Sequence, residues 1–193
     1  QRLRGMFAFA IWDQSCRSLL LARDRLGQKP LYYYFDDDKF VFGSEIKAIL
    51  EYPGVSRIVN RRVLPLYLSY GYVPAPHTMF EGIYALLPGH SLQIHEGRID
   101  TKEYWIPEKR DNLVNTTGWG EEEWGAALMD QIREAVTARL VSDVPIGAFL
   151  SGGLDSSAIV ALMVEASAVP VKTFAIGFSD ESSFDESPFA RRV

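Results

Sequence analysis

Hydrophobic and polar positions change in short blocks through the first hundred residues, and this spacing is typical of antiparallel strands. Short apolar runs are joined by polar turns such as Asp36-Asp37-Asp38-Lys39 and Glu96-Gly97. We therefore predict consecutive hairpins that form an antiparallel sheet. The strands of these hairpins are expected at 6–12 and 19–23, at 31–35 and 40–43, and at 91–95 and 98–105.

Two short helices are expected between the second and third hairpins. Ser44 is positioned to cap a helix that ends at Leu50, because a serine hydroxyl accepts hydrogen bonds from the first backbone N–H groups of a helix. Residues 61–70 predict a second helix, ended by Gly71 in the left-handed conformation that glycine adopts easily.

The pattern changes near residue 120 from hairpins to alternating helices and strands. Residues 121–141 carry an apolar side chain at every fourth position, which predicts an amphipathic helix, and the apolar run 146–150 predicts a buried parallel strand. The change predicts two domains, 1–107 and 121–193, joined by a polar linker at 108–120. The apolar stripe of the helix is Trp124, Leu128, Ile132, Val136 and Leu140.

The run Ser151-Gly152-Gly153-Leu154-Asp155-Ser156-Ser157 follows this strand and opens another helix. Gly152 and Gly153 are expected with positive φ, so that loop N–H groups converge at the helix N-terminus and favour an anion. The serines add hydroxyl donors, and Asp155 beside a phosphate predicts an intervening Mg²⁺. No lysine follows the glycines, as a Walker A loop would require. The run therefore predicts a phosphate site of another type.

This run resembles the pyrophosphate-binding loop of ATP pyrophosphatases, which cleave ATP between its α and β phosphates. Composition is consistent with a globular enzyme of this kind, since 47% of residues are hydrophobic and the net charge is −5. No basic block indicates nucleic acid or anionic lipid, and no apolar run is long enough to span a bilayer. The single cysteine, Cys16, fits a reducing compartment, so we expect a cytoplasmic protein.

Motifs in the first half extend the resemblance. Leu3-Arg4-Gly5-Met6-Phe7-Ala8-Phe9-Ala10, the run from Ala22 to Tyr33 that contains Asp24-Arg25-Leu26-Gly27, and Gly43-Ser44-Glu45-Ile46-Lys47-Ala48 resemble the second half of an N-terminal-nucleophile glutamine amidotransferase domain. Joined to the serine–glycine loop, they resemble the glutamine-hydrolysing asparagine synthetases. The implied fold class is a partial α+β antiparallel amidotransferase sandwich followed by a partial α/β parallel sheet of the ATP pyrophosphatase (adenine-nucleotide alpha-hydrolase-like) type.

The resemblance also implies ligands and site residues. ATP and Mg²⁺ are the expected cofactors, with Asp155 holding the metal through pyrophosphate and Glu186, beside Asp185, as a second candidate near the nucleotide. Glutamine and aspartate are the other small-molecule partners, and a homodimer is left open. The implied ATP- and pyrophosphate-binding residues are Phe149, Leu150, Ser151, Gly152, Gly153, Asp155, Ser156, Ser157, Ile176 and Gly177.

The sequence departs from the family at the glutaminase centre. The family's nucleophile is an N-terminal cysteine, whereas this sequence begins with Gln1, so we expect a fragment that lacks glutaminase activity. Cys16 lies in a predicted turn and does not replace that nucleophile. Two alternatives stay open: a related synthetase acting on another carboxylate, of the β-lactam or peptide-cyclising type, or a non-catalytic nucleotide-binding remnant.

Two further groups of polar residues are interpreted as structural. The charged residues Arg23, Asp24, Arg25 and Lys29 are expected to form a salt-bridged turn between two strands. The three histidines do not have the spacing of metal ligands, and we interpret them as loop or turn residues.

Overall fold

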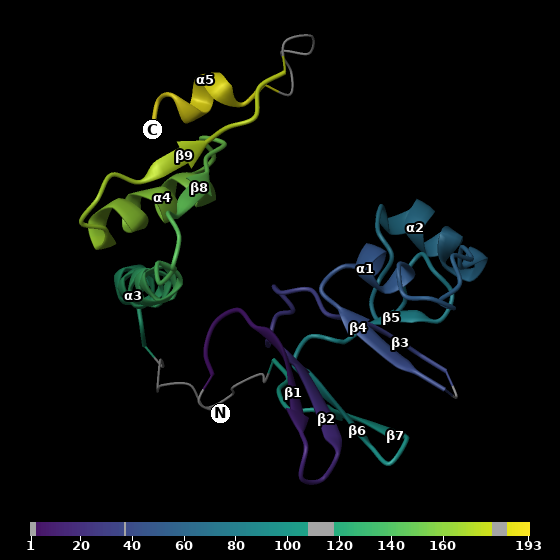
Figure 1. The fold of residues 1–193 in the computed structure, drawn as a ribbon. Coiled ribbons are helices and arrows are strands. Elements are labelled where there is room, and N and C mark those ends of the chain that lie inside the picture. The colour runs from purple at the N-terminus through teal and green to yellow at the C-terminus, as the bar shows by residue number, and fades with distance from the viewer. Residues whose placement is uncertain (1–2, 37, 108–117, 179–184) are drawn as a thin grey trace. The chain divides into compact units, whose positions relative to one another are not determined.

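The computed structural model describes residues 3–36, 38–107, 118–178 and 185–193. The chain divides into two compact units, Gln1–Lys109 and Arg110–Val193, whose elements are labelled in Figure 1.

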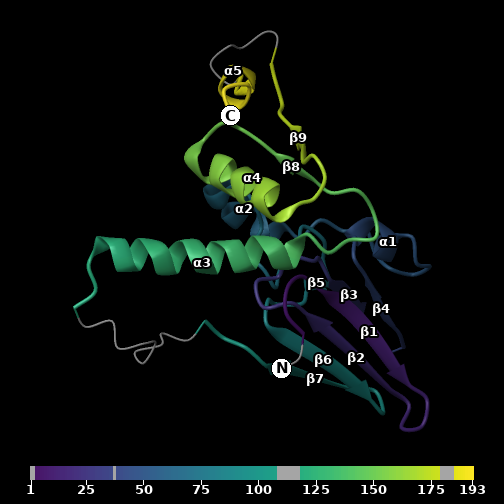
Figure 2. The same ribbon diagram turned by 90° about the vertical axis from the view of Figure 1, so that its left-hand side faces the viewer.

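The first unit contains two antiparallel sheets (Figure 2). One sheet has the strand order β1-β2-β6-β7, and Leu21 in its second strand lies opposite Leu92 in its third. The hairpins predicted at 6–12 with 19–23 and at 91–95 with 98–105 are thus confirmed. Its strands are β1 (Ala8–Asp13), β2 (Ser18–Arg23), β6 (His90–His95) and β7 (Arg98–Glu103).

The other sheet has the order β4-β3-β5, with β3 (Tyr32–Phe35), β4 (Phe40–Gly43) and β5 (Ile83–Ala85). The hairpin of β3 and β4 is confirmed, but the prediction that consecutive hairpins share one sheet is wrong. After β2, the chain turns at Asp24, and β2 pairs with the distant β6 instead. β5 was not predicted, because three residues are too few to establish a periodicity.

Apolar side chains fill the space on both faces of the β4-β3-β5 sheet. Leu21 and Leu92 of the larger sheet belong to a buried cluster against which Tyr33 and Phe40 pack, so the two sheets enclose one core. A second cluster, with Ile49 and Ile83, lies between the smaller sheet and α1 (Ile46–Leu50). The helix therefore shields the sheet face that the first core leaves free.

The short helices of this unit differ in detail from the prediction. Glu45, not Ser44, occupies the N-cap of α1 and makes no side-chain capping bond, so the predicted Ser44 cap is wrong. The helix expected at 61–70 is confirmed as η1 (Arg61–Val63) continuing into α2 (Leu64–Tyr70). Gly71 ends it with a φ of 75°, as predicted.

The second unit is built around a parallel pair of strands. β8 (Gly147–Phe149) pairs with β9 (Lys172–Phe174), and α4 (Leu154–Ala166) connects them. The unit also contains α3 (Glu121–Arg139) and α5 (Ser187–Ala190). The strand predicted over 146–150 is confirmed in part: Leu150 is buried, whereas Phe149, its neighbour in an extended chain and so on the opposite face, is exposed.

The apolar stripe predicted along α3 packs only in its second half. Ile132, Val136 and Leu140 join the buried cluster of Leu162 and Met163 in α4. The predicted helix is confirmed, but Trp124 and Leu128 of its apolar stripe are 53% and 60% exposed. Periodicity identifies the helix but does not show how much of its apolar stripe a neighbouring element covers.

Antiparallel sheets followed by a parallel pair agree with the predicted classes. The predicted linker at 108–120 lies largely outside the described residues. Within those residues, no helix is both long and apolar enough to cross a membrane.

The turn after β2 is organised by a buried carboxylate. Asp24 is 1% exposed and accepts N–H bonds from Gln28 and Lys29 at 2.9 Å, from Leu26 at 3.2 Å and from Phe7 at 3.3 Å. Arg23 donates to the carbonyl oxygens of Lys29, Gly27 and Leu86. The predicted salt-bridged turn is therefore corrected: these charges satisfy main-chain groups, which the folded turn would otherwise leave buried without partners.

Replacing Asp24 with asparagine is expected to destabilise the first unit by about 1.5–3 kcal/mol at neutral pH, the range for bonds to a charged acceptor. Burial raises the pKa of Asp24, but the four backbone bonds outweigh it and hold the pKa below its ordinary value of 3.8. The stabilisation is thus complete above pH 3.8 and is lost as pH falls through the lower folded-state pKa.

Urea unfolding of the wild type and Asp24→Asn, compared at neutral pH and below pH 3.8, measures this difference. The exposed Asp100→Asn in β7 is the control and should unfold like the wild type. Equal stability of wild type and Asp24→Asn at neutral pH would refute the role of this carboxylate.

Candidate functional site

The serine–glycine loop joins β8 to α4 in the second unit. Leu150 anchors its start, because its N–H donates to the Phe174 carbonyl at 2.8 Å at the end of β9. Gly152 has a φ of 80°, as predicted, whereas Gly153 has a φ of −72° and is the N-cap of α4. The expectation of positive φ at Gly153 is wrong, since one left-handed residue is enough to turn the chain into the helix.

The loop serines are bonded to one another and to the backbone. Ser151 Oγ lies 2.9 Å from Ser156 Oγ, and Ser157 Oγ donates to the Gly153 carbonyl at 2.7 Å. Ser156 Oγ lies 3.2 Å from the same carbonyl. These bonds fix the hydroxyls around the first turn of α4, so the loop is held in shape by its own side chains.

The N-terminus of α4 lacks a side-chain cap. The first intrahelical bond of this end is the one from Ser157 N–H to the Gly153 carbonyl, at 3.0 Å. By helix geometry, the preceding N–H groups of Leu154, Asp155 and Ser156 have no acceptor within the helix. With three serines nearby and none capping, these donors stay available to an anion at the positive end of the helix dipole.

Helix α5 packs directly on this loop. A Cβ atom on Gly152 would lie 2.4 Å from the Phe189 carbonyl carbon and 2.7 Å from the Ala190 nitrogen. A Cβ on Gly177 would lie 2.7 Å from Ser187 Oγ and 3.1 Å from Asp185 Oδ1. The segment 185–190 thus spans the loops that follow the carboxyl ends of β8 and β9, the edge at which parallel sheets bind ligands.

The other predicted nucleotide residues follow β9. β9 ends at Phe174, and Ile176 is 63% exposed after it. Asp185 Oδ1 accepts a hydrogen bond from Ser187 N–H at 3.0 Å. The pKa of Asp185 is lowered by its bonds to the Ser187 side chain and backbone, with a smaller contribution from the charge of Arg191. Glu186 is the N-cap residue of α5. Asp185 therefore lies close to Gly177.

Asp155 is the predicted metal-linked residue. Its carboxylate is exposed in the first turn of α4, on the same turn as the free N–H groups. No group of three or more His, Cys, Asp or Glu side chains in the described residues is arranged to hold a metal ion. This donor set fits Mg²⁺, which commonly binds through one or two carboxylates plus substrate phosphates.

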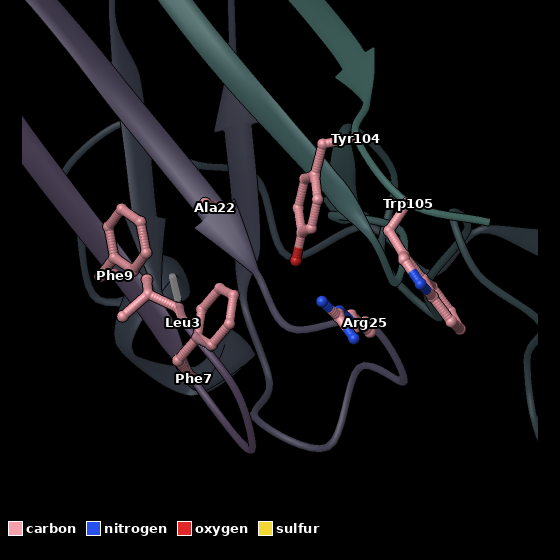
Figure 3. Close-up of a pocket in the computed structure, with 7 residues that line it drawn as sticks. All are labelled: Leu3, Phe7, Phe9, Ala22, Arg25, Tyr104 and Trp105. Carbon is pink, nitrogen blue, oxygen red and sulfur yellow. The ribbon is translucent and has the colours of Figure 1, made fainter. Parts of the chain in front are cut away.

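The first unit contains an apolar pocket of about 280 Å³ on the outer side of the larger sheet, which the sequence did not indicate (Figure 3). Arg25 lies 5.7 Å from the centre of the Trp105 ring, and the Tyr104 hydroxyl donates to the Arg23 carbonyl. Its walls come from segments eighty residues apart, so no local motif identifies it. The lining residues are Leu3, Phe7, Phe9, Ala22, Arg25, Tyr104 and Trp105.

Comparison with known families assigns both halves of the chain. Residues 1–105 match the family described as "Glutamine amidotransferase domain", and residues 127–193 match "Asparagine synthase". These matches define the class as an amidotransferase region followed by an asparagine synthase region.

Similar proteins carry both regions in the same order. "Putative asparagine synthetase [glutamine-hydrolyzing] 2" of Methanocaldococcus jannaschii is 35% identical over 196 residues, covering 100% of this chain and 37% of the relative. "Asparagine synthetase [glutamine-hydrolyzing] 3" of Bacillus subtilis is 37% identical over 187 residues, covering 94% and 30%. The chain therefore belongs to the family of glutamine-hydrolysing asparagine synthetases, as its motifs predicted.

A further relative carries a different name. "Amidase chyE" of Penicillium rubens is 35% identical over 205 residues, covering 99% of this chain and 30% of the relative. The chain spans about a third of the length of these curated relatives. A solved structure described as the "allosteric regulatory enzyme of purine biosynthesis" covers 87% of this chain and 32% of its own at 13% identity, but its TM-score of 0.28 supports no conclusion on the fold.

Proposed function

We propose that the second unit binds ATP and Mg²⁺ and adenylates the side-chain carboxylate of aspartate in a glutamine-dependent asparagine synthetase. The observation that carries this proposal is the uncapped N-terminus of α4 directly after Ser151-Gly152-Gly153, in a chain of this family. An uncapped N-terminus in a glycine turn suits the pyrophosphate group of ATP. In the proposed domain assignment, residues 1–107 belong to the glutaminase domain, 108–120 are a linker and 121–193 belong to the synthetase domain.

The proposed reaction has two steps, and in each of them one bond forms as another breaks. A carboxylate oxygen of aspartate bonds to the α-phosphorus of ATP. The bond from that phosphorus to the oxygen that bridges the α and β phosphates breaks, and pyrophosphate is released with the bridging oxygen. Ammonia from glutamine then attacks the acyl carbon, and AMP leaves with that carboxylate oxygen. Free N–H groups of α4 bind the departing pyrophosphate, where fixed donors in a transition state typically contribute about 2.7–4 kcal/mol each.

Mg²⁺, when bound, would neutralise charge on the phosphate oxygens. Asp155 holds the metal in this proposal, and its place on the first turn of α4 puts the carboxylate beside the anion-binding donors. The carbonyl and N–H groups at Ile176 and Gly177, after β9, are proposed to contact the nucleotide base. Both residues are exposed after the end of a parallel strand, which suits such a contact.

A second candidate keeps the adenylation step but changes the acceptor. The relative named an amidase is as similar to this chain as a relative named asparagine synthetase, at 35% identity each. Relatives of equal similarity to this chain therefore carry different names, which favours another amide-forming synthetase as the alternative. No observation in the described residues selects the carboxylate.

Substrate dependence of AMP formation tests the proposal. The full-length protein is incubated with ATP, Mg²⁺, glutamine and one carboxylic acid at a time, and AMP and pyrophosphate are measured. We expect both products to form only with L-aspartate, with asparagine as the third. Formation with another acid would support the second candidate, and a lack of AMP with every acid would support the non-catalytic alternative.

A further inference from the structure

Another cavity of the first unit, of about 440 Å³, is lined by residues of two segments, 60–66 in η1 and α2 and 77–84 before and within β5. Its volume falls within the range of about 300–1,000 Å³ that is usual for small-molecule sites. Both apolar side chains and charged side chains of opposite sign contribute to its walls. The composition of this lining indicates which kind of ligand the cavity suits.

Backbone hydrogen bonds hold the two segments side by side. Asn60 N–H donates to the Met79 carbonyl at 2.8 Å. In the same way, Glu81 N–H donates to the Ile58 carbonyl at 2.9 Å. The buried hydroxyl of Thr78 donates to the carbonyl of the first residue of β5 at 2.8 Å. The backbone of the cavity is therefore fixed before a ligand binds, which lowers the entropic cost of binding.

Two opposite charges line this cavity without pairing. Arg62 and Glu81 form no ion pair with each other, and neither side chain has a hydrogen bond or ion pair to any other residue that the structure describes. The only bond of Arg62 to a side chain is made by its backbone N–H, which donates to Asn60 Oδ1 at 3.2 Å. Both residues are exposed, so a ligand can reach them from solvent. A ligand that carries both charges can pair with each of them.

The apolar part of the lining restricts the rest of the ligand. Val63 and Ile83 are buried, and Leu66 and Phe80 are half-buried. All four line the same cavity as the charged residues. Such a surface favours an aliphatic group of a few carbon atoms, because contact with these side chains removes it from water.

We propose that this cavity binds an α-amino acid with an apolar side chain. The Arg62 guanidinium pairs with the α-carboxylate, which its planar fork of N–H donors suits, and the Glu81 carboxylate accepts hydrogen bonds from the α-ammonium group. The ring of His77, which also lines the cavity, provides a further polar contact. Aspartate and glutamine have polar side chains, so the ligand is not a substrate of the proposed reaction, and this inference does not depend on the proposed function.

Calorimetry on the full-length protein tests the site, with L-leucine as the probe. Two analogues each lack one charge of L-leucine: isocaproate lacks the ammonium group, and isoamylamine lacks the carboxylate. We expect the wild type to bind L-leucine at least about fivefold more tightly than either analogue, a scale between that of an exposed ion pair and that of a hydrogen bond to a charged group.

Variants of the two charged residues should respond to different analogues. Arg62→Gln should weaken the binding of L-leucine and isocaproate at least about fivefold and leave isoamylamine within about twofold of the wild type. Glu81→Gln should weaken L-leucine and isoamylamine by a similar factor and leave isocaproate unaffected. Arg61→Gln is the matched control, because it removes the same charge from a neighbouring residue that does not line the cavity.

A wild type that does not bind L-leucine would overturn the proposal. Unchanged L-leucine binding in both Arg62→Gln and Glu81→Gln would also overturn it, because the amino acid would then bind elsewhere in the protein. So would an equal loss of all three ligands in either variant, since the two charges would then not act on separate groups of the ligand. These outcomes leave the proposed function untouched, because that function is tested with ATP and aspartate.

Discussion

Asp155→Asn in the full-length protein is expected to lower the exchange of labelled pyrophosphate into ATP, in the presence of aspartate, by at least about 100-fold. The substitution preserves the volume of the side chain but removes the charge that holds Mg²⁺ against the departing pyrophosphate. Asp155 is exposed and accepts no capping bond, so its loss should not disturb the helix.

Glutamine hydrolysis is the internal control for this variant. We assign that chemistry to the amidotransferase region, whose family match covers residues 1–105, so ammonia release should continue at the wild-type rate. Normal pyrophosphate exchange in Asp155→Asn would contradict the metal-linked role. Parallel loss of both activities would indicate misfolding rather than a local effect.

The second large effect is expected at Gly152. Alanine there must adopt a φ of 80°, which costs a non-glycine residue about 1–2 kcal/mol, and its Cβ would lie 2.4 Å from the Phe189 carbonyl carbon. Because this neighbour is backbone, the overlap is relieved only if α5 or the loop itself shifts. Gly152→Ala should therefore weaken ATP binding at least about tenfold and lower the melting temperature of the second unit.

Gly153 provides a matched control one residue further on. Its φ is −72°, and a Cβ there would lie 3.4 Å from Ser151 Oγ, which is an ordinary contact. Gly153→Ala should leave the melting temperature of the second unit close to that of the wild type, because alanine fits there without displacing α5. Equal tolerance of alanine at both positions, measured by calorimetry, would show that α5 does not pack on the loop as described.

The contrast between these glycines illustrates what the sequence could predict. The strand, the loop and α4 follow from one local run, because glycines, serines and apolar periodicity all indicate the same turn. Which glycine takes positive φ depends on how the chain leaves β8, and the Gly–Gly pair does not show this. The contact of Gly152 with Phe189 joins residues far apart in the chain, so it required the structure.

The first unit shows the same limit. The hairpins join neighbouring segments of the chain and were predicted. The pairing of β2 with β6 joins distant segments and was not predicted, and with it the hairpins lie in two different sheets. In the sequence, Asp24 is one of several neighbouring charged residues. Only the fold shows that its carboxylate is buried and accepts four backbone N–H bonds. Buried polar networks connect distant backbone groups, so composition and spacing describe them poorly.

Isotope transfer from the acceptor carboxylate tests the central claim most directly. The full-length protein is incubated with ATP, Mg²⁺, glutamine and aspartate whose side-chain carboxylate carries ¹⁸O, and the nucleotide products are analysed by mass spectrometry. Adenylation predicts AMP that contains one ¹⁸O atom, because the carboxylate oxygen bonded to the α-phosphorus leaves with AMP. Unlabelled AMP, or ADP with ¹⁸O in inorganic phosphate, would contradict attack at the α-phosphorus and the function proposed for the second unit.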